Sequence, residues 1–595
     1  MSGKPKPAFF VAVGFVVLGL VLFAFYRMDK GRNQPGPGAA KQGTDVADGN
    51  IDPNQLNPAP DGTQDASTPE SADPKNAASV TTVQEYKFVP SQRLPEVKQG
   101  TAAYKPMVDN TVRFALNVWA GWAPILHANN GMQPGKVWKT PDGKEFRVEL
   151  VLMDDPIGMQ DAYAAGDVHI GWGTLDMVPL MLERLVNADG KPRDVRVMPR
   201  IFQQVDWSNG GDGIVARDSI RTVADLRGKK IVMAESSPSH YFALNMLVAG
   251  GLQPSEVEPF FTQTAFEAAA AFNAKPDIAA AVSWAPDIYN LSEVKGNKLL
   301  VSTQVANKLI ADVWFARADF AADHPDIVEG LVRGIFDAME ELKSDAARES
   351  VARIMGEAYG LPPAEAAGML GDAHSTNYAE NRQFFLNQNN PTNFERVWNQ
   401  AYYLYRKIGK IRHQQVKFDQ IMDFSVIQKL GSEEKYASQK DEYSVQFVPK
   451  TTSEIQEAEE ILTNTVVIHF FPNSHDLYKK TTENGEEKLY DPNVDLILEE
   501  IAKLAGQFGA AQIVIEGHTD SSMRGRAPDT LVKELSSLRA NAVKEALVQK
   551  FPSLDPNQFS TAGLGWDRPA DPGDPQNQAK NRRVEIKIYP AESGG

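Results

Sequence analysis

The residues most able to do chemistry in this 595-residue chain gather near its C-terminal end. Ile513 and Ile515 alternate as on a half-buried strand, and Asp520 follows at its end. A stretch with apolar residues at helical spacing comes next and carries Arg539 beside its apolar face. A basic turn with Arg582 then leads into a last strand. One carboxylate and two guanidinium groups would suit a zwitterion, because its ammonium pairs with Asp and its carboxylate accepts a bidentate Arg.

Three motifs hold these residues: Gly517-His-Thr-Asp520, Leu535-Ser-Ser-Leu-Arg-Ala-Asn-Ala-Val543 and Asn581-Arg-Arg-Val-Glu-Ile586. In this order they resemble the OmpA-like peptidoglycan-binding domain, over about residues 455–590. The resemblance implies an α+β domain of β-α-β-α-β order that binds meso-diaminopimelate of the peptidoglycan stem peptide. The predicted peptidoglycan-binding residues are Asp520, Arg539, Arg582, Asn581 and Ser522. The alternative is that both arginines form only surface salt bridges.

Composition limits the remaining possibilities. The net charge is 61 − 77 = −16, which argues against nucleic acid as a partner. The chain has no cysteine, and therefore no disulfide, thiolate metal site or cysteine nucleophile. It also lacks a P-loop, a Gly-x-Ser-x-Gly elbow and a His-Glu-x-x-His motif. We therefore expect a binding protein rather than an enzyme, with no metal and no cofactor.

The first 32 residues predict a membrane anchor. Ala8 to Tyr26 is an uncharged apolar run of 19 residues, about 28 Å as a helix, close to the thickness of a bilayer core. An uncleaved anchor is favoured over a cleaved signal peptide, because no small-x-small site directly follows the run. The run has no Asp, Glu or His to relay ions. Residues 33–107 are read as a disordered tether, since their first 50 or so are rich in Pro, Gly and polar residues.

Residues 108–430 alternate strand and helix patterns, which predicts a parallel α/β architecture. Aromatic and small polar residues occupy several strand-to-helix junctions, where open α/β sheets bind ligands. The candidate cleft residues are Trp119, Trp122, Ser237, His240, Trp284 and Asp287. The serines of Glu235-Ser-Ser-Pro-Ser-His240 could bind an anion at a helix start, or simply cap that helix. Residues 431–454 are polar and predict a linker.

This middle region resembles the periplasmic substrate-binding proteins of ABC transporters, of the nitrate, sulfonate, taurine and thiamine-precursor type. The segments that carry the resemblance are Trp119-Ala-Gly-Trp122, Ala165-Gly-Asp-Val-His-Ile-Gly171, Val223-Ala-Asp-Leu-Arg-Gly-Lys-Lys-Ile231, Glu235-Ser-Ser-Pro-Ser-His240 and Ser283-Trp-Ala-Pro-Asp287. It implies two α/β lobes, about 108–208 plus 310–430 and about 212–305, that close on an oxyanion, sulfonate or small amine. An ABC-transporter permease is the implied partner.

Together these features predict a single-pass inner-membrane protein whose bulk lies in the periplasm, where it binds peptidoglycan and a small solute. The alternative is an envelope scaffold or motor-associated linker whose lobes no longer bind solute.

Overall fold

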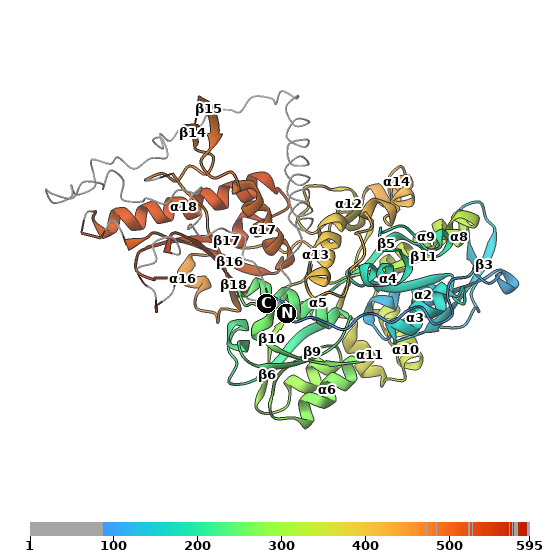
Figure 1. The fold of residues 1–595 in the computed structure, drawn as a ribbon. Helices are drawn as coiled ribbons and strands as arrows, with labels where there is room; N and C mark the ends of the chain where they lie inside the picture. Colours follow the sequence, from blue (N-terminus) through green and yellow to red (C-terminus); the bar gives the residue numbers. More distant parts are fainter. Residues whose placement is uncertain are drawn as a thin grey trace, which may run out of the picture. The chain divides into compact units, whose positions relative to one another are not determined.

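The computed structural model (Figure 1) describes residues 87–591, apart from 472, 484, 522, 523, 526, 571, 574 and 576–580. The predicted membrane span, Ala8 to Tyr26, and the tether as far as residue 86 lie outside these residues. In the described part of the chain, no helix is both long and apolar enough to cross a bilayer.

A seven-stranded mixed sheet forms the first lobe, in the order β12-β5-β11-β4-β1-β3-β2. Strand β1 pairs in parallel with β3 and β4, whereas β11 runs antiparallel to both β4 and β5. The strands are β1 (Thr111–Leu116), β2 (Trp138–Lys139), β3 (Glu145–Leu152), β4 (Ile170–Thr174), β5 (Pro199–Ser208), β11 (Ala311–Arg317) and β12 (Ala373–Ser375). Its helices are α2 (Ala123–Asn129), α3 (Pro156–Ala164), α4 (Met177–Leu185), α8 (Ala318–Asp323), α9 (Pro325–Glu341), α10 (Asp345–Tyr359), α11 (Pro363–Met369), α12 (Tyr378–Leu386), α13 (Phe394–Lys407) and α14 (Ser425–Leu430).

A five-stranded sheet of order β10-β6-β9-β7-β8 forms the second lobe. Strand β7 pairs in parallel with β8 and β9, and β6 runs antiparallel to β9 and β10. The elements are β6 (Asp212–Arg217), β7 (Lys230–Ala234), α5 (Pro238–Ala249), β8 (Glu258–Thr262), α6 (Ala265–Ala274), β9 (Ile278–Trp284), α7 (Asp287–Ser292) and β10 (Asn297–Ser302). The chain crosses from β5 to β6 through residues 209–211 and returns from β10 to β11 through residues 303–310.

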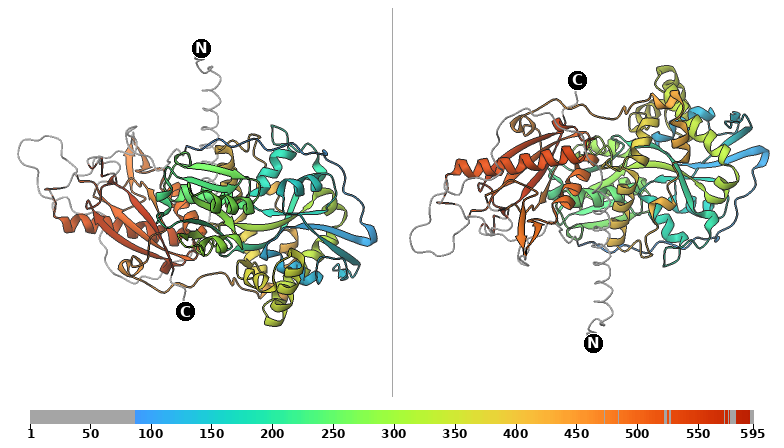
Figure 2. Two further views of the ribbon diagram at one scale, coloured as in Figure 1. Left: turned by 90° about the horizontal axis from the view of Figure 1, so that it is seen from below. Right: turned by 90° about the horizontal axis from the view of Figure 1, so that it is seen from above.

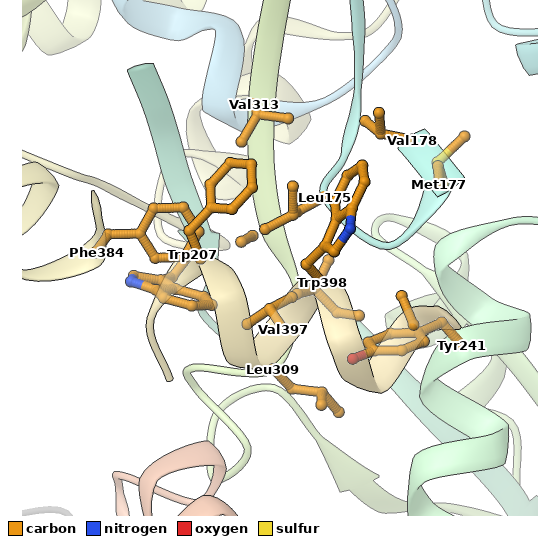
Figure 3. Close-up of a cluster of buried hydrophobic side chains, with 14 of the residues drawn as sticks. Leu175, Met177, Val178, Trp207, Tyr241, Leu309, Val313, Phe384, Val397 and Trp398 are labelled. Atoms are coloured by element: carbon orange, nitrogen blue, oxygen red, sulfur yellow. The ribbon is translucent and has the colours of Figure 1, made fainter. Parts of the chain in front are cut away.

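Large buried aromatic side chains pack helix α13 of the first lobe against helix α5 of the second lobe. Figure 3 shows Trp398 and Val397 of α13 beside Trp207 of β5 and Tyr241 of α5. The Trp398 ring is fully buried, and its Nε1 donates to the Val416 carbonyl at 3.0 Å. A buried tryptophan requires such a partner for its N–H. Helix α13 therefore belongs to the core of the lobe and is not a surface addition.

The first lobe extends beyond its expected limits at both ends. Residues 87–107, expected in the tether, run along its surface: Ala102 N donates to Ala164 O at 3.0 Å, and Arg184 Nε donates to Pro95 O at 2.9 Å. In the expected linker 431–454, helix α15 (Glu434–Ala437) buries Tyr436. Both segments carry isolated apolar residues that lack a periodic pattern, so only the lobe they meet shows that they pack.

The C-terminal domain has a four-stranded sheet of order β13-β18-β16-β17, with α18 packed on β16 and β17 (Figures 1 and 2). Its elements are α16 (Thr452–Ile455), β13 (Leu462–Val466), β14 (Lys480–Glu483), β15 (Glu486–Leu489), α17 (Val494–Gln507), β16 (Ala511–His518), α18 (Asp529–Lys550), β17 (Phe559–Gly565) and β18 (Val584–Pro590). The order differs from the expected β-α-β-α-β in two ways. A β14–β15 hairpin precedes α17, and β17 and β18 follow α18 in succession.

Two glycines allow α18 to lie close to the sheet. A Cβ on Gly517 would lie 2.1 Å from the Ser536 carbonyl oxygen, and one on Gly563 would lie 2.3 Å from that of Lys533. Real atoms do not approach this closely, so either side chain would push α18 away. The glycine of the Gly-His-Thr-Asp motif is therefore required by helix packing.

We expect Gly517→Ala to destabilise the C-terminal domain by about 1–3 kcal/mol, the usual cost of overpacking a well-packed site. Hydrogen exchange measured by mass spectrometry should show faster exchange in β16, β17 and α18. Gly368→Ala is the matched control, because nothing lies within 4 Å of the added carbon there. Unchanged exchange in the Gly517 variant would contradict the packing argument.

Candidate functional site

A cavity of about 430 Å³, partly open to solvent, lies between the two lobes, and we call it the cleft. Its lining comes from both lobes, largely at the carboxyl ends of parallel strands. The lining residues are Asn117, Trp119, Asp154, Pro156, Trp172, Thr174, Ile310 and Asp312 from the first lobe and the return crossover, and Asp212, Ser237, Pro238 and Trp284 from the second. Strand ends of this kind form the ligand sites of open α/β sheets.

Strand register brings the acidic residues of the cleft together. Asp312 on β11 pairs with Thr174 of β4 on one side and with Asp206 of β5 on the other. In the second lobe, Asp212 on β6 pairs with Trp284 of β9. Like charges directly opposite on neighbouring strands are unfavourable, so the fold alone gives no reason for this arrangement.

Trp119 links the cleft wall to the buried carboxylates. Its Nε1 lies 3.3 Å from both carboxylate oxygens of Asp206. A Cβ on Gly121 would lie 1.6 Å from Asp206 Oδ2, and one on Gly211 would lie 2.3 Å from the Trp119 ring. The glycine at the second position after Trp119 and the glycine of the first crossover are therefore needed to seat this pair.

Burial dominates the electrostatics of the cleft. Burial raises the pKa of Asp212 to about 7, and the charges of Asp176 and Asp372 add to the effect. Burial likewise raises the pKa of Asp206 to about 8, and it holds the pKa of Asp312 well above the usual range of a carboxyl. Removing a carboxylate from water without a cation favours its neutral form. These groups therefore hold protons near neutral pH in the empty cleft.

The structure places three of the six predicted cleft residues in the cleft lining and three elsewhere. Trp119, Ser237 and Trp284 line the cleft. Trp122 is 1% exposed in the core, where its Nε1 donates to Asn117 Oδ1 at 2.7 Å. His240 is also buried, and its burial lowers its pKa to about 4.

Asp287, the sixth predicted residue, starts α7 and is half-buried outside the cleft lining. Sequence reasoning missed the main acidic residues, Asp212 and Asp312. Both residues lie at the starts of antiparallel strands, whereas the predicted cleft residues follow the ends of parallel strands. Asp212 closes the stretch Asp206-Trp-Ser-Asn-Gly-Gly-Asp212, whose paired carboxylates could have signalled it.

A second cavity, which we call the arginine pocket, lies in the C-terminal domain. It measures about 420 Å³ and is lined by Ile468, His469, Phe470, His518, Arg539, Arg582, Arg583 and Val584. Arg539 lies on α18, its Nε donates to the Ser474 carbonyl at 3.0 Å, and its guanidinium is 4.8 Å from the Phe470 ring centre. The pocket therefore presents guanidinium groups from a helix and from the turn before β18.

Antiparallel pairing of β16 with β18 brings Asp520 beside Arg582, because Gly517 pairs with Val584. Asp520 is fully buried and accepts a hydrogen bond from Arg582 Nη1. It supports the pocket from behind and is not among the lining residues. An exposed surface salt bridge, the alternative considered for the arginines, does not fit a 0% exposed carboxylate.

Two further predicted residues have other placements. Asn581 braces a loop, since its Nδ2 donates to Pro575 O at 2.9 Å and its Oδ1 accepts from Ala570 N at 2.9 Å. Ser522 lies outside the described residues.

Glu516, His518 and Glu585 place three possible metal-ligand atoms within 4.8 Å of one another. Lys587 Nζ already lies 3.7 Å from Glu516 and 3.8 Å from Glu585. Burial opposes ionisation of Glu585, yet His518 and Arg583 hold its pKa at about 2. The three residues fit an internal ion-pair network, because Lys587 and Arg583 balance the charges of the two glutamates.

We expect Asp212→Asn to stabilise the empty protein increasingly as pH rises. Between pH 4 and 7 the folded protein keeps a proton that the unfolded chain releases, so rising pH costs the wild type stability and spares the variant. The gain should grow from near zero at pH 4 to at most about 4 kcal/mol at pH 7, at about 1.4 kcal/mol per pKa unit. Denaturant unfolding at several pH values measures it. Asp218→Asn, at an exposed site just past the end of β6, is the control. Equal curves for wild type and the Asp212 variant would refute the buried-proton argument.

Known proteins share both halves of this arrangement. Residues 147–347 match the family described as NMT1/THI5 like, and residues 483–583 match the OmpA family. The chain is 30% identical over 195 residues to the taurine-binding periplasmic protein of Escherichia coli, which is 32% of this chain and 57% of that protein. It is 35% identical over 109 residues to outer membrane protein Omp38 of Acinetobacter baumannii, which is 18% of this chain and 28% of that protein. The chain thus spans little more than half of the first relative and less than a third of the second.

Among solved structures, the periplasmic aliphatic sulphonate binding protein of Escherichia coli is 18% identical with a TM-score of 0.41, over 53% of this chain and 97% of that one. The periplasmic nitrate-binding protein of Synechocystis is 14% identical with a TM-score of 0.41, over 56% and 91%. Both resemblances drawn from the motifs are confirmed by the family matches: the chain joins an NMT1/THI5-like segment to a C-terminal OmpA domain.

Proposed function

We propose that this protein is a periplasmic binding protein that captures a small solute in the cleft and holds peptidoglycan through the arginine pocket. The observation that carries the first part is the meeting of strand ends from both lobes on one cavity, with three tryptophans and three aspartates in its wall. A cavity that combines apolar rings with a few polar groups is typical of small-molecule sites. The taurine-binding relative supports the same reading.

Peptidoglycan binding is supported by the chemistry of the arginine pocket. Arg539 and Arg582 approach it from different elements and can each offer a pair of donors to a carboxylate. Diaminopimelate carries such carboxylates beside ammonium groups. Asp520 lies outside the lining and pairs with Arg582, which holds this guanidinium at the pocket.

The proposal also includes a membrane anchor. The uncharged stretch from Ala8 to Tyr26 has the length of a membrane span, and binding to peptidoglycan would require the remainder of the chain to lie in the periplasm. The protein would then be a single-pass inner-membrane protein that hands its solute to an ABC-transporter permease.

We expect Arg539→Ala to reduce pull-down by purified sacculi at least tenfold, because the pocket loses its helix-borne guanidinium. Asp520→Ala should do the same by releasing Arg582. Arg539→Lys keeps the charge but loses the planar pair of donors, so intermediate binding is expected. Arg568→Ala removes an exposed guanidinium outside the pocket and should bind as wild type does. Full retention by both the Arg539→Ala and Asp520→Ala variants would refute peptidoglycan binding at this pocket.

For the solute, a thermal-shift screen of the full-length protein against small anions, amines and zwitterions should yield at least one stabilising compound. A ligand at 100 times its Kd stabilises by about 2.7 kcal/mol. Gly121→Ala should abolish that shift, because the added carbon displaces Asp206 and Trp119. No shift with any compound would favour the scaffold alternative, in which the lobes bind no solute.

A further inference from the structure

The charged side chains that line the cleft are all acidic. They are Asp154, Asp212 and Asp312, and none of the described lining residues is Lys, Arg or His. Asp206 lies beside Asp312, as its cross-strand partner on β5. An anionic group entering this cavity would therefore meet carboxylates from both lobes and no cationic side chain.

The buried carboxylates of the cleft have only neutral donors. Asp212 accepts from the Ser208 hydroxyl at 2.7 Å, and Asp206 accepts from Trp119. Among the described residues, no cation forms an ion pair with Asp206, Asp212 or Asp312, although each is at most 4% exposed. A buried carboxylate without a cation is costly.

The same lobe handles buried carboxylates differently elsewhere. Asp161 pairs with Arg184 at 2.5 Å, and Asp319 pairs with Arg317 at 2.8 Å. Charge compensation thus occurs at two buried carboxylates of this lobe, and the described lining of the cleft lacks it. The missing positive charge is what a ligand would supply.

The aromatic lining also favours a cation. Three tryptophans line the cavity: Trp119 after β1, Trp172 within β4 and Trp284 at the end of β9. The Nε1 of Trp119 is directed to Asp206, and that of Trp172 donates to the Met153 carbonyl at 3.0 Å. The N–H groups of these two indoles are therefore already engaged, and what the rings can add for a ligand is the attraction of an aromatic ring for an ammonium group.

The remaining polar groups of the cleft also favour a cation over an anion. The Ser237 hydroxyl, predicted to help bind an anion, donates to the Ala234 carbonyl of its own loop at 2.9 Å. Pro238, the first residue of α5, has no N–H to offer. The Thr174 hydroxyl lines the cleft and donates to the Asp176 carboxylate, which leaves its oxygen as an acceptor. It can accept a hydrogen bond from an ammonium group.

Building on the proposed solute-binding function, we propose that the cleft selects a small organic cation, with Asp212 and Asp312 binding its ammonium group and the three tryptophans enclosing its carbon body. A sulfonate or oxyanion without an ammonium group is then excluded, because none of the described lining residues offers it a cation.

Cation binding should be coupled to proton release. In the empty cleft, burial and the charges of Asp176 and Asp372 raise the pKa of Asp212 to about 7. Burial and the charge of Asp212 raise the pKa of Asp206, which pairs with Asp312, to about 8. A bound cation favours the ionised carboxylates, so protons must leave as it enters. Affinity should therefore rise with pH between 6 and 8.

Calorimetric titration of the full-length protein tests this with ethylamine, ethanolamine, choline, taurine, ethanesulfonate and nitrate. We expect one or more of the three cations to bind with proton release, and ethanesulfonate and nitrate not to bind. Asp312→Asn and Asp212→Asn should each weaken cation binding at least tenfold, whereas Asp218→Asn should not. Because the Asp212 variant is expected to be more stable than wild type, misfolding would not explain its loss.

Each other outcome is decisive. Binding of ethanesulfonate or nitrate, or taurine binding more than tenfold tighter than ethanolamine, would overturn the cation assignment while leaving solute binding intact. Cation binding that both Asp→Asn variants retain would overturn the assigned residues. Failure of every compound here and in the thermal-shift screen would overturn solute binding itself.

Discussion

The cost of burying carboxylates between the two lobes shapes the central part of this protein. Asp206 and Asp312 are neighbours on adjacent strands, and Asp212 faces them from the other lobe. Neutral donors hold these groups and no described cation balances them. Stability alone would favour neutral side chains here, so the cluster is best understood as a site that trades stability for binding.

Several features of the fold follow from seating this cluster. Gly121 and Gly211 lack side chains where Trp119 and Asp206 must fit. The two crossovers place the start of β6 opposite the start of β11, which brings aspartates distant in sequence to one cavity. Gly211 of the first crossover therefore has a direct steric role beside Trp119.

The C-terminal domain follows a different rule, because its charges are compensated. Asp520 pairs with Arg582, Glu585 with Arg583, and Lys587 lies between Glu516 and Glu585. Close packing of α18 on Gly517 and Gly563 then sets the position of Arg539 in the pocket. One chain thus carries an arginine-rich pocket and an acidic cleft, which suit ligands of different charge.

Motifs whose residues lie close together along the chain could be recognised from the sequence alone. The sequence alone indicated the C-terminal motifs, the α/β alternation and three cleft residues, because strand ends, helix starts and glycine positions are encoded over a few residues. It also placed Trp122 and His240 in the cleft, where the structure instead buries them in the core. Aromatic and polar residues at a junction look alike in sequence whether they face a ligand or the interior.

The sequence by itself determined the two kinds of domain and the residues Asp520, Arg539 and Arg582, since each belongs to a short motif. Only the tertiary structure decided that residues 87–107 and α15 pack on the first lobe and that Asp520 pairs with Arg582. It also decided that Asp212 and Asp312 line one cavity, with Asp206 paired to Asp312. These outcomes depend on strand register and on the crossing of the chain between lobes, which join residues more than a hundred positions apart, as in the Asp206–Asp312 pair, and leave no local pattern.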